Sequence, residues 1–196
     1  MIGVLALQGA FHSHQTLLDE LGSSTLQVRT PSDLERVDAL VMPGGESTTM
    51  SRLLATSGLF DPIAARLANG MPVFGTCAGM ILLATEIIDG RPDQRAFGAV
   101  DISVQRNGYG RQLDSFETDI HVPGLGIGSA PFHGVFIRAP KVVRLGTDVD
   151  VLAEHNGVPV LLRSGPITVA SFHPELASDA RVHAQFIDSF QSHREI

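Results

Sequence analysis

The segment Met71-Pro-Val-Phe-Gly-Thr-Cys-Ala-Gly-Met-Ile-Leu-Leu-Ala-Thr-Glu-Ile-Ile88 gives the clearest indication of the architecture of this chain. Its apolar residues Pro72 to Phe74 predict a short buried strand, and the apolar run from Ala78 to Ile88 predicts a buried helix. Between them, glycines two places on either side of Cys77 permit a sharp turn from strand into helix. The segment therefore predicts a strand, a tight turn and a helix in immediate succession.

Strands and helices alternate in the same way on the N-terminal side of this segment. Apolar runs predict strands over Ile2–Leu7, Thr25–Arg29 and Ala39–Met42. Helical signals separate them: an apolar face at Leu17, Leu18 and Leu21, a capping box at Ser32-Asp-Leu-Glu35, and a capping Asp61-Pro62 before Ile63–Ala68. This alternation is typical of a parallel α/β sheet.

The C-terminal half is richer in β-structure. Further strands are predicted over Val100–Gln105, Ser115–His121, Gly134–Arg138 and Ile167–Phe172, and a last helix over Asp179–Phe190. Asn156-Gly157 tolerates the positive φ values of a type I′ turn and predicts a hairpin of Val149–Glu154 with Val158–Arg163. We therefore expect a single domain over residues 1–196. Its fold class is a three-layer, flavodoxin-like α/β/α domain with a mostly parallel central sheet and an added antiparallel segment.

The composition fits one soluble domain and excludes several classes of function. The 196 residues (20.9 kDa) are 43% hydrophobic and 18% charged, which is enough for a sizeable core. A net charge of −7, with Lys141 as the single lysine, argues against partners such as nucleic acid or an anionic membrane. One cysteine excludes an internal disulfide and a multi-cysteine metal site. With no secretory signal and no apolar run of roughly 20 residues, we expect a cytoplasmic protein.

Cys77 is the first candidate for chemistry. Its predicted position at a helix N-terminus favours the thiolate over the thiol, because backbone N–H groups and the helix dipole stabilise an anion there. The N–H of Ala78, directly after it, is placed to serve an oxyanion hole. The alternative is a buried structural cysteine, which is common for this residue type.

His173-Pro-Glu175 follows the last predicted strand and is the second candidate. Functional groups of parallel sheets collect at the carboxyl ends of strands, where both Cys77 and His173 are expected. A histidine there can deprotonate the thiol and later protonate a leaving amine, while Glu175 holds the tautomer. The alternative is a strand-end histidine on the surface beside an ordinary capping acid.

A glycine-rich loop, Pro43-Gly-Gly-Glu-Ser-Thr-Thr49, follows the third predicted strand. Its two glycines let the backbone approach a ligand closely, and the N–H of Gly45 is a second donor for an oxyanion. The loop lacks the pattern and the lysine of a phosphate-binding loop. The alternative is a plain turn in which Ser47 or Thr48 caps a helix.

Two arginine-containing stretches carry weaker signals. Arg106-Asn-Gly-Tyr-Gly-Arg-Gln112 places two guanidinium groups around a glycine-rich turn, which suits a carboxylate, and Arg138 ends a predicted strand. Each also fits a solvated turn. We predict neither a metal nor a cofactor. The remaining histidines have no metal-ligand spacing and are interpreted as surface or structural, with the exception that His14 lies near the end of the first predicted strand: His12, His14, His121, His133, His155, His183 and His193.

Together these motifs resemble the class I, or triad, glutamine amidotransferases, and more narrowly the glutaminase subunit of pyridoxal 5′-phosphate synthase. The resemblance runs in order along nearly the whole chain. The narrower motifs are Leu7-Gln-Gly-Ala10, Pro43–Met50, Arg106–Gln112 with Asp114–Glu117, Val135–Pro140 and Ser171–Leu176. One departure is Ser13-His14, where the family often has Glu-His.

The resemblance implies hydrolysis of L-glutamine to glutamate and ammonia, with Cys77 as nucleophile, His173 as general base and acid, and Glu175 as the residue that orients it. The ammonia would pass through a protein channel to a synthase subunit that makes pyridoxal 5′-phosphate, in a large hetero-oligomer with twelve copies of each subunit in the family. Family members are poorly active until that partner docks. Contacts to the glutamine are implied for Gly45, Glu46, Ser47, Arg106, Ile137 and Arg138.

Three other functions stay open on the sequence. One is an amidotransferase that feeds a different synthase, such as one for imidazole glycerol phosphate, which the narrow motifs disfavour. Another is a stand-alone cysteine hydrolase, or a redox or stress protein, on a similar scaffold. The last is a non-catalytic interaction subunit, which an intact Cys-His-Glu set disfavours.

Overall fold

The computed structural model describes residues 1–108, 115–125 and 130–194. Its first half holds β1 (Ile2–Leu5), α1 (Phe11–Glu20), β2 (Thr25–Val28), α2 (Pro31–Leu34), β3 (Ala39–Met42), α3 (Ser47–Thr56), α4 (Phe60–Ala68), β4 (Val73–Thr76), α5 (Ala78–Leu83) and β5 (Ala84–Ile87). Its second half holds β6 (Val100–Gln105), β7 (Ser115–Ile120), β8 (Phe132–Ile137), β9 (Lys141–Leu145), β10 (Asp150–His155), β11 (Val158–Ser164), β12 (Ile167–Ala170), the short 3₁₀ turn η1 (Pro174–Leu176) and α6 (Arg181–Arg194).

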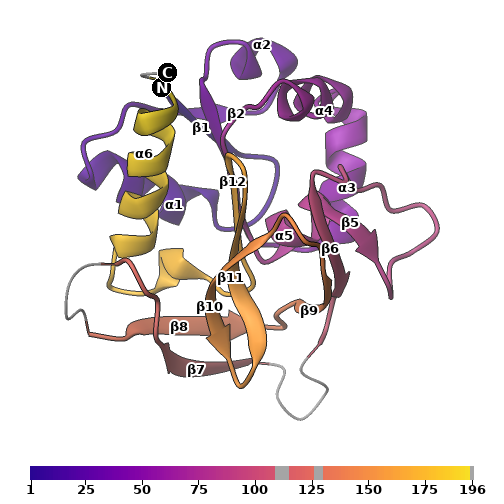
Figure 1. Ribbon diagram of the computed structural model, residues 1–196. Helices are drawn as coiled ribbons and strands as arrows, with labels where there is room; N and C mark the ends of the chain where they lie inside the picture. The colour runs from indigo at the N-terminus through magenta and orange to yellow at the C-terminus, as the bar shows by residue number, and fades with distance from the viewer. Residues whose placement is uncertain (109–114, 126–129, 195–196) are drawn as a thin grey trace.

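A seven-stranded sheet forms the centre of the molecule, in the order β10-β11-β12-β4-β3-β1-β2 (Figure 1). The neighbours from β12 to β2 are parallel, whereas β10 and β11 join antiparallel at one edge. Asn156 and Gly157, both at positive φ, make the turn of the β10–β11 hairpin, as the Asn-Gly pair predicts. A mostly parallel sheet with an added antiparallel segment is therefore confirmed.

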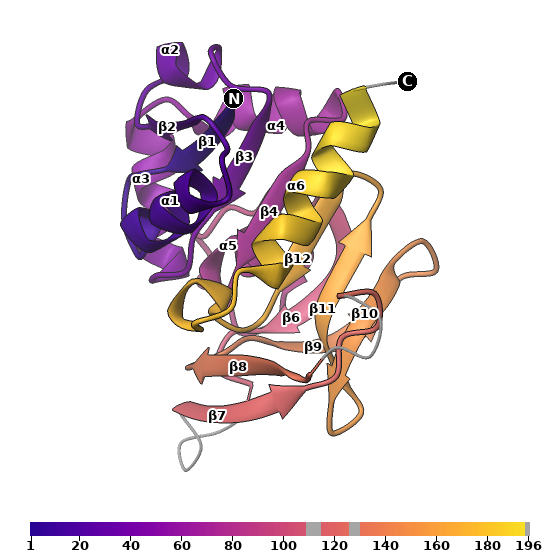
Figure 2. The same ribbon diagram turned by 90° about the vertical axis from the view of Figure 1, so that its left-hand side faces the viewer.

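Helices cover both faces of this sheet and make three layers (Figure 1 and Figure 2). On one face, Leu18 of α1 and Phe186 of α6 belong to the buried cluster that packs these helices against the strands. On the other face, Leu34, Leu54 and Ile63 do the same for α2, α3 and α4. Strands β1, β3, β4 and β12 are buried along their whole length because both of their faces are covered.

The order of the strands determines which loops meet. Strands β1, β3, β4 and β12 are neighbours and parallel, so their carboxyl ends lie along one edge of the sheet. The segments that follow these ends carry Gln8, Gly45, Cys77 and His173. Topology alone thus brings four distant parts of the chain together at one place.

Two smaller sheets lie beyond this edge. One has the order β5-β6-β9, and the other is the antiparallel pair β7–β8, seen at the bottom of Figure 1. The backbone N–H of His173 donates to the carbonyl oxygen of Val135 in β8 at 2.8 Å. This bond fixes the end of β8, and with it Ile137 and Arg138, next to the segment that follows β12.

The helix predicted over Ala78–Ile88 is wrong in its second half. Helix α5 ends at Leu83, and the next four residues form β5, which pairs in parallel with β6. The Thr85 hydroxyl donates to the carbonyl oxygen of Val100 at 2.8 Å, which strengthens this pairing. An apolar run does not by itself distinguish a buried helix from a strand, and here pairing with a distant segment decides.

The capping box before α2 lies two residues earlier than predicted. The Thr30 hydroxyl accepts from the N–H of Asp33, and the Asp33 carboxylate accepts from the N–H of Thr30. Pro31 occupies the first helical position, where its fixed φ suits the helix and its missing N–H costs nothing. Proline therefore determines the start of α2. The capping box consists of Thr30 and Asp33, and its prediction at Ser32 and Glu35 is wrong.

Helix α4 also starts earlier than predicted. Its first residue is Phe60, so Asp61 and Pro62 lie inside the first turn instead of capping it. Proline is tolerated there because the first N–H groups of a helix have no acceptor within it. Phe60 stacks on Phe97 with ring centroids 4.4 Å apart, a tertiary contact that favours this extension.

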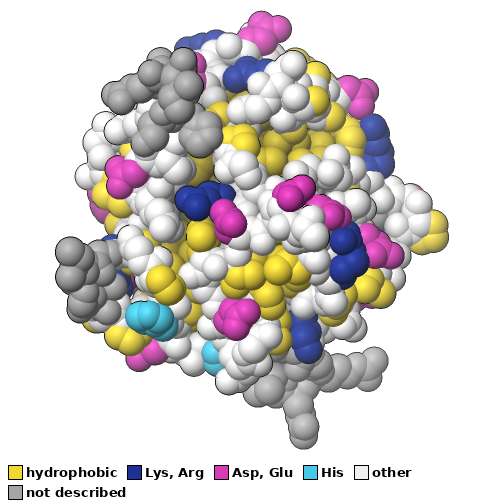
Figure 3. Space-filling view, in the orientation of Figure 1, with side chains coloured by type: hydrophobic (Ala, Val, Ile, Leu, Met, Phe, Trp, Pro, Cys, Tyr) yellow, Lys and Arg dark blue, Asp and Glu magenta, His cyan; other side chains and the backbone are white. Residues whose placement is uncertain are grey.

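Charged side chains of both signs are interspersed on the face of the molecule shown in Figure 3. Within residues 1–108, 115–125 and 130–194, no helix is both long and apolar enough to cross a membrane. In the same ranges, the His, Cys, Asp and Glu side chains form no cluster of three or more that is suited to a metal ion.

Candidate active site

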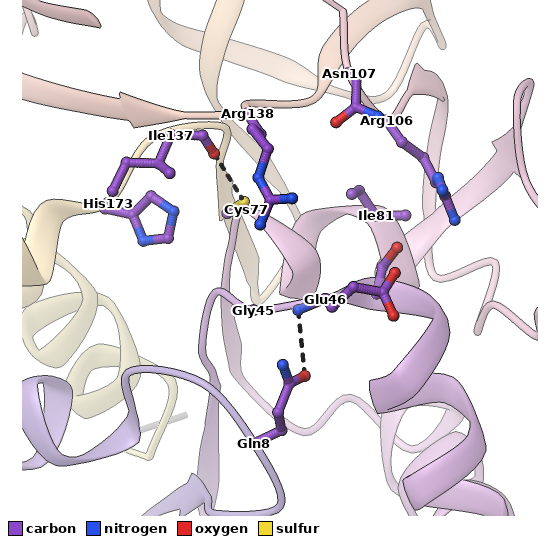
Figure 4. A pocket seen from close by; sticks show the side chains of 11 residues that line it. Gln8, Gly45, Glu46, Cys77, Ile81, Arg106, Asn107, Ile137, Arg138 and His173 are labelled. Atoms are coloured by element: carbon purple, nitrogen blue, oxygen red, sulfur yellow. Dashed lines mark hydrogen bonds between the residues drawn. The ribbon is translucent and has the colours of Figure 1, made fainter. Parts of the chain in front are cut away.

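A pocket of about 360 Å³ opens at the carboxyl edge of the central sheet (Figure 4). Cys77 and His173 line it, and Glu175 is buried beside His173. Gln8, Ile81 and Asn107 also line it, although no motif pointed to Ile81 or to the side chain of Gln8 as a pocket group. All six residues for which glutamine contacts are implied line the same pocket: Gly45, Glu46, Ser47, Arg106, Ile137 and Arg138.

The turn between β4 and α5 is strained at Cys77. This residue has φ 48° and ψ −100°, a conformation that costs a non-glycine residue on the order of 1–3 kcal/mol. Glycine is required on both sides: a Cβ at Gly79 would lie 2.2 Å from the carbonyl oxygen of Met42, and one at Gly75 would lie 2.9 Å from the Gly79 backbone. The N–H of Cys77 donates to the carbonyl oxygen of Ala170 in β12 at 2.8 Å, which holds the turn in place.

The thiol of Cys77 borders the pocket while the residue is only 5% exposed. Its Sγ lies 3.9 Å from the carbonyl oxygen of Ile137, to which the thiol donates. Figure 4 shows the imidazole of His173 and the guanidinium of Arg138 around the same sulfur atom. Ala78 begins α5, so its N–H has no acceptor within the helix and is free to meet a ligand.

His173 stands between Cys77 and Glu175. Its Nδ1 lies 2.8 Å from Oε1 of Glu175, so Nδ1–H donates to the carboxylate and Nε2 is left for the thiol. Burial disfavours the imidazolium, but the hydrogen bonds to Cys77 and Glu175 outweigh it and raise the pKa of His173 to about 10. The raised pKa favours the protonated imidazole of His173 beside the Cys77 side chain.

Gly44 packs against both members of this pair. A Cβ on Gly44 would lie 2.3 Å from Cε1 of His173 and 3.3 Å from the Cβ of Cys77. The backbone of the β3 loop thus limits where the imidazole can sit, and a side chain at this position would displace it.

Glu175 is buried and ionised. Burial raises the pKa of its carboxyl, but the hydrogen bond from His173 and the proximity of His14 lower it further, so that the pKa lies below its ordinary value. Its Oε2 lies 3.3 Å from Nε2 of His14, a fully buried residue of α1. Sequence reasoning did not assign His14 to the site; its spacing of four residues before the buried Leu18 is the signal that it faces inward.

Glu46, rather than Ser47 or Thr48, is the N-cap of α3. Its Oε1 accepts from the N–H of Thr48 at 3.0 Å and its Oε2 from the N–H of Thr49 at 2.7 Å. Burial raises the pKa of this carboxyl, but these bonds outweigh it and lower the pKa to about 2. Gln8 Oε1 accepts from the N–H of Glu46 at 3.2 Å. The cap therefore fixes a permanent negative charge at the rim of the pocket.

Arg106 and Arg138 bring two guanidinium groups to the pocket. The Nη1 of Arg106 donates to Oγ1 of Thr48 at 2.7 Å and to Oε1 of Gln94 at 2.9 Å, which holds it beside α3. Arg138 follows β8 with φ 43° and is exposed. With Glu46, the pocket offers cations for a carboxylate and an anion for an ammonium group, which is the complement of a free α-amino acid. Residues 109–112 of the Arg106–Gln112 motif and Asp114 of the Asp114–Glu117 motif lie outside the described residues.

Comparison with known proteins gives the following relatives. The profile of the SNO glutamine amidotransferase family matches residues 4–192. A pyridoxal 5′-phosphate synthase subunit PdxT from Mycobacteroides abscessus is 53% identical over 188 residues, covering 96% of each chain. A protein of the same name from Herpetosiphon aurantiacus is 54% identical over 188 residues, covering 95% of this chain and 98% of its own.

Solved structures agree on the fold. A glutamine amidotransferase superposes with a TM-score of 0.90 at 46% identity, over 97% of this chain and 98% of its own. A protein described as part of a putative GMP synthase, from Thermoplasma acidophilum, has a TM-score of 0.70 at 19% identity, over 99% of this chain and 95% of its own. The latter likeness concerns the fold alone.

Proposed function

The chain belongs to the SNO glutamine amidotransferase family, and on that premise we propose that it hydrolyses L-glutamine with Cys77, His173 and Glu175 and passes the ammonia to a partner synthase. It is a glutaminase, a hydrolase of the side-chain amide that serves pyridoxal 5′-phosphate synthesis. The observation that carries the triad assignment is the imidazole of His173, which has the Glu175 carboxylate 2.8 Å from Nδ1 and the thiol of Cys77 on its other side.

The substrate is bound through its zwitterionic end. The guanidinium groups of Arg106 and Arg138 attract the α-carboxylate, and the fixed carboxylate of Glu46 attracts the α-ammonium group. Ile137 and Ile81 offer apolar surface to the methylene groups. The amide then lies at the inner end of the pocket, where Cys77 stands.

In the first half-reaction, the Cys77 thiolate attacks the amide carbon and the carbonyl oxygen becomes an oxyanion. The N–H groups of Ala78 and Gly45 are the donors proposed to stabilise that charge. The imidazolium of His173 gives its proton to the amide nitrogen, the C–N bond breaks, and ammonia leaves. The product on the enzyme is a thioester between Cys77 and the γ-carbonyl of glutamate.

In the second half-reaction, the now neutral His173 removes a proton from water, and the hydroxide attacks the thioester. The second tetrahedral intermediate expels the Cys77 thiolate and releases glutamate, which regenerates the imidazolium–thiolate pair. Glu175 stays ionised throughout and holds the ring with Nδ1–H towards it. These steps use only side chains and N–H groups of the chain itself, so the proposal includes no cofactor.

The partner follows from the relatives. Two proteins that share 53% and 54% identity with the chain carry the name pyridoxal 5′-phosphate synthase subunit. We therefore extend the proposal to a complex with a synthase subunit that receives the ammonia through a channel and makes pyridoxal 5′-phosphate, in the cytoplasm. Such transfer protects the ammonia from protonation in bulk water.

The test is ammonia release from L-glutamine by wild type and Cys77→Ala, with and without the synthase subunit. Wild type should be active, and more so with the synthase subunit. Cys77→Ala should release no ammonia and still bind the synthase subunit in size-exclusion chromatography. His133→Ala is a matched control, because this exposed histidine pairs with Glu117 outside the pocket. Turnover in Cys77→Ala would refute the nucleophile, and activation by a different synthase alone would refute the partner.

A further inference from the structure

Two histidines that the proposed reaction does not use are buried behind the triad. His14 of α1 and His183 of α6 have no exposed surface, and Nδ1 of His14 lies 2.9 Å from Nε2 of His183. The opposite nitrogen of His14, Nε2, lies 3.3 Å from Oε2 of Glu175 and 3.2 Å from the hydroxyl of Thr76. A continuous row of polar groups therefore leads from α6 through α1 to the triad.

Both histidines are neutral. Burial lowers the pKa of His14, with the Glu175 charge opposing and the His173 charge supporting the shift. Burial and His14 lower the pKa of His183 to about 3, against the opposing charge of Glu175. Each ring consequently carries one proton, on one of its two nitrogens. The tautomer of His14 determines whether an N–H group or a lone pair lies next to Glu175.

The geometry favours one of the two possible tautomer pairs. If Nδ1 of His14 held the proton and donated to His183, the lone pair of Nε2 would accept from the Thr76 hydroxyl at 3.2 Å but would also lie 3.3 Å from the Glu175 carboxylate. His183 would then hold its own proton on Nδ1, which is buried and has no hydrogen-bond partner among the described residues. That arrangement combines a repulsive contact with an orphaned buried N–H group, a rare and costly feature.

The other pair avoids both costs. His183 donates Nε2–H to Nδ1 of His14, and His14 carries its proton on Nε2, which bonds to the Thr76 hydroxyl at 3.2 Å and lies 3.3 Å from Oε2 of Glu175. On the two rings, Nδ1 of His183 alone then lacks a hydrogen-bond partner among the described residues, and it is a lone pair rather than an N–H group. Among the described residues, Oε2 of Glu175 has no partner of good hydrogen-bond geometry, so the Nε2–H dipole of His14 at 3.3 Å is the positive group beside this oxygen.

We propose that His14 is a positioning residue of the glutaminase site, which steadies the Glu175 carboxylate by the electrostatic attraction of Nε2–H at 3.3 Å, and that His183 fixes the tautomer of His14. The inference rests on the proposed role of Glu175 as the residue that orients His173. Without the Nε2–H dipole, the buried Oε2 would lose the positive group beside it, and the carboxylate would turn away or take up a proton more readily. Either change would release the imidazole of His173 from its orientation.

The tautomers are tested without any activity measurement. In the full chain labelled with [¹⁵N]histidine, two-bond proton–nitrogen spectra distinguish protonated from unprotonated ring nitrogens, and His14→Gln and His183→Gln assign the signals. We expect His14 and His183 to be neutral and protonated on Nε2 between pH 6 and pH 9. A proton on Nδ1 of either ring, or a doubly protonated His14, would overturn the proposal.

The kinetic test uses the complex with the synthase subunit and compares His14→Leu with His14→Gln. The leucine removes the donor, and kcat should fall about tenfold or more while KM for glutamine stays within about twofold, because the pocket is untouched. The amide of glutamine reaches close to the position of Nε2 and can donate from there, so His14→Gln should recover most of kcat. Leu18→Val, one turn along the same buried helix face, controls for lost packing and should keep kcat.

The outcomes separate this inference from the proposed function. If wild type shows no Cys77-dependent ammonia release, the proposed function fails, whatever the tautomers are. If wild type is active but His14→Leu matches it, or if Leu18→Val loses as much kcat as His14→Leu, the positioning role is refuted. Failure of a folded His14→Gln to exceed His14→Leu in kcat also refutes it, and thermal melts establish that each variant is folded.

Discussion

Nδ1 of His173 and Oε1 of Glu175 lie 2.8 Å apart, and both side chains are buried. A charge-assisted hydrogen bond in such surroundings fixes both the orientation of the imidazole and the nitrogen that carries its proton. Glu175 follows His173 by two residues across Pro174, so the partners are adjacent in the sequence, while the burial that strengthens their bond comes from the surrounding fold.

Glu175→Gln should lower kcat by roughly 10²- to 10⁴-fold without unfolding the protein. The amide is nearly isosteric but carries no charge, so the imidazolium loses its stabilising partner and the pKa of His173 falls from about 10. Ammonia release measures the effect, and the thermal melt should stay close to that of wild type. Unchanged turnover in a folded variant would exclude the orienting role.

Gly44→Ala should lower kcat, because the added methyl group would displace His173. The added Cβ would lie 2.3 Å from Cε1 of the imidazole, and we expect kcat to drop at least about tenfold because small displacements of catalytic groups are costly. Gly70→Ala is the matched control: its Cβ would meet open space, and the φ of 80° would strain an alanine, so this variant should lose stability but keep kcat. Equal kcat values for the two variants would contradict the prediction.

Arg138→Gln should raise KM for glutamine about 10- to 100-fold with little change in kcat. A lost hydrogen bond to a charged group costs about 1.5–3 kcal/mol, and the α-carboxylate is remote from the reacting amide. Glutamine is as strained as arginine at φ 43°, so the backbone effect is matched. Arg163→Gln removes an exposed arginine that pairs with Asp150, and it should leave KM unchanged. An unaltered KM in Arg138→Gln would remove Arg138 from the substrate contacts.

The free energy of unfolding at acid pH should reveal the contribution of the Glu46 carboxylate that caps α3. The folded pKa is lowered from 4.5 to about 2, so the carboxylate contributes stability above pH 4.5 that is lost as pH falls towards 2. The difference in the free energy of unfolding between wild type and Glu46→Gln should therefore be constant near neutrality and shrink over this window. Thr49→Val removes a hydroxyl donor 2.6 Å from Oε2, so the loss should occur at higher pH. Urea denaturation at several pH values measures both, and a difference that does not vary with pH would contradict the prediction.

Much of the site is predictable because its parts follow parallel strands. The carboxyl ends of neighbouring strands must share an edge, so a cysteine after β4 and a histidine after β12 meet even though the chain between them is long. The turn at Cys77 is predictable from glycines alone, since Gly79 approaches the Met42 backbone where no Cβ fits. Short motifs are sufficient to predict the site here, because the local turn and the strand order place the same residues at the same edge of the sheet.

The remaining features depend on contacts that no local pattern encodes. Ala84–Ile87 becomes strand β5 because β6 pairs with it, and the same apolar run is equally suited to a helix. His14 and His183 are 169 residues apart and meet only when α1 and α6 pack on the same face of the sheet. The sequence around a single histidine on a helix does not indicate such a distant partner. Both histidines are therefore interpreted as structural when only the spacing of residues is considered.

The left-handed torsion at Cys77 has a consequence beyond catalysis. Every L side chain at this position opposes folding, whereas glycine adopts φ 48° without penalty. Cys77→Gly should therefore relieve the backbone strain at this turn and, because it removes the proposed nucleophile, abolish turnover. A related chain with glycine at this position would therefore keep the turn and the fold but lack the proposed nucleophile.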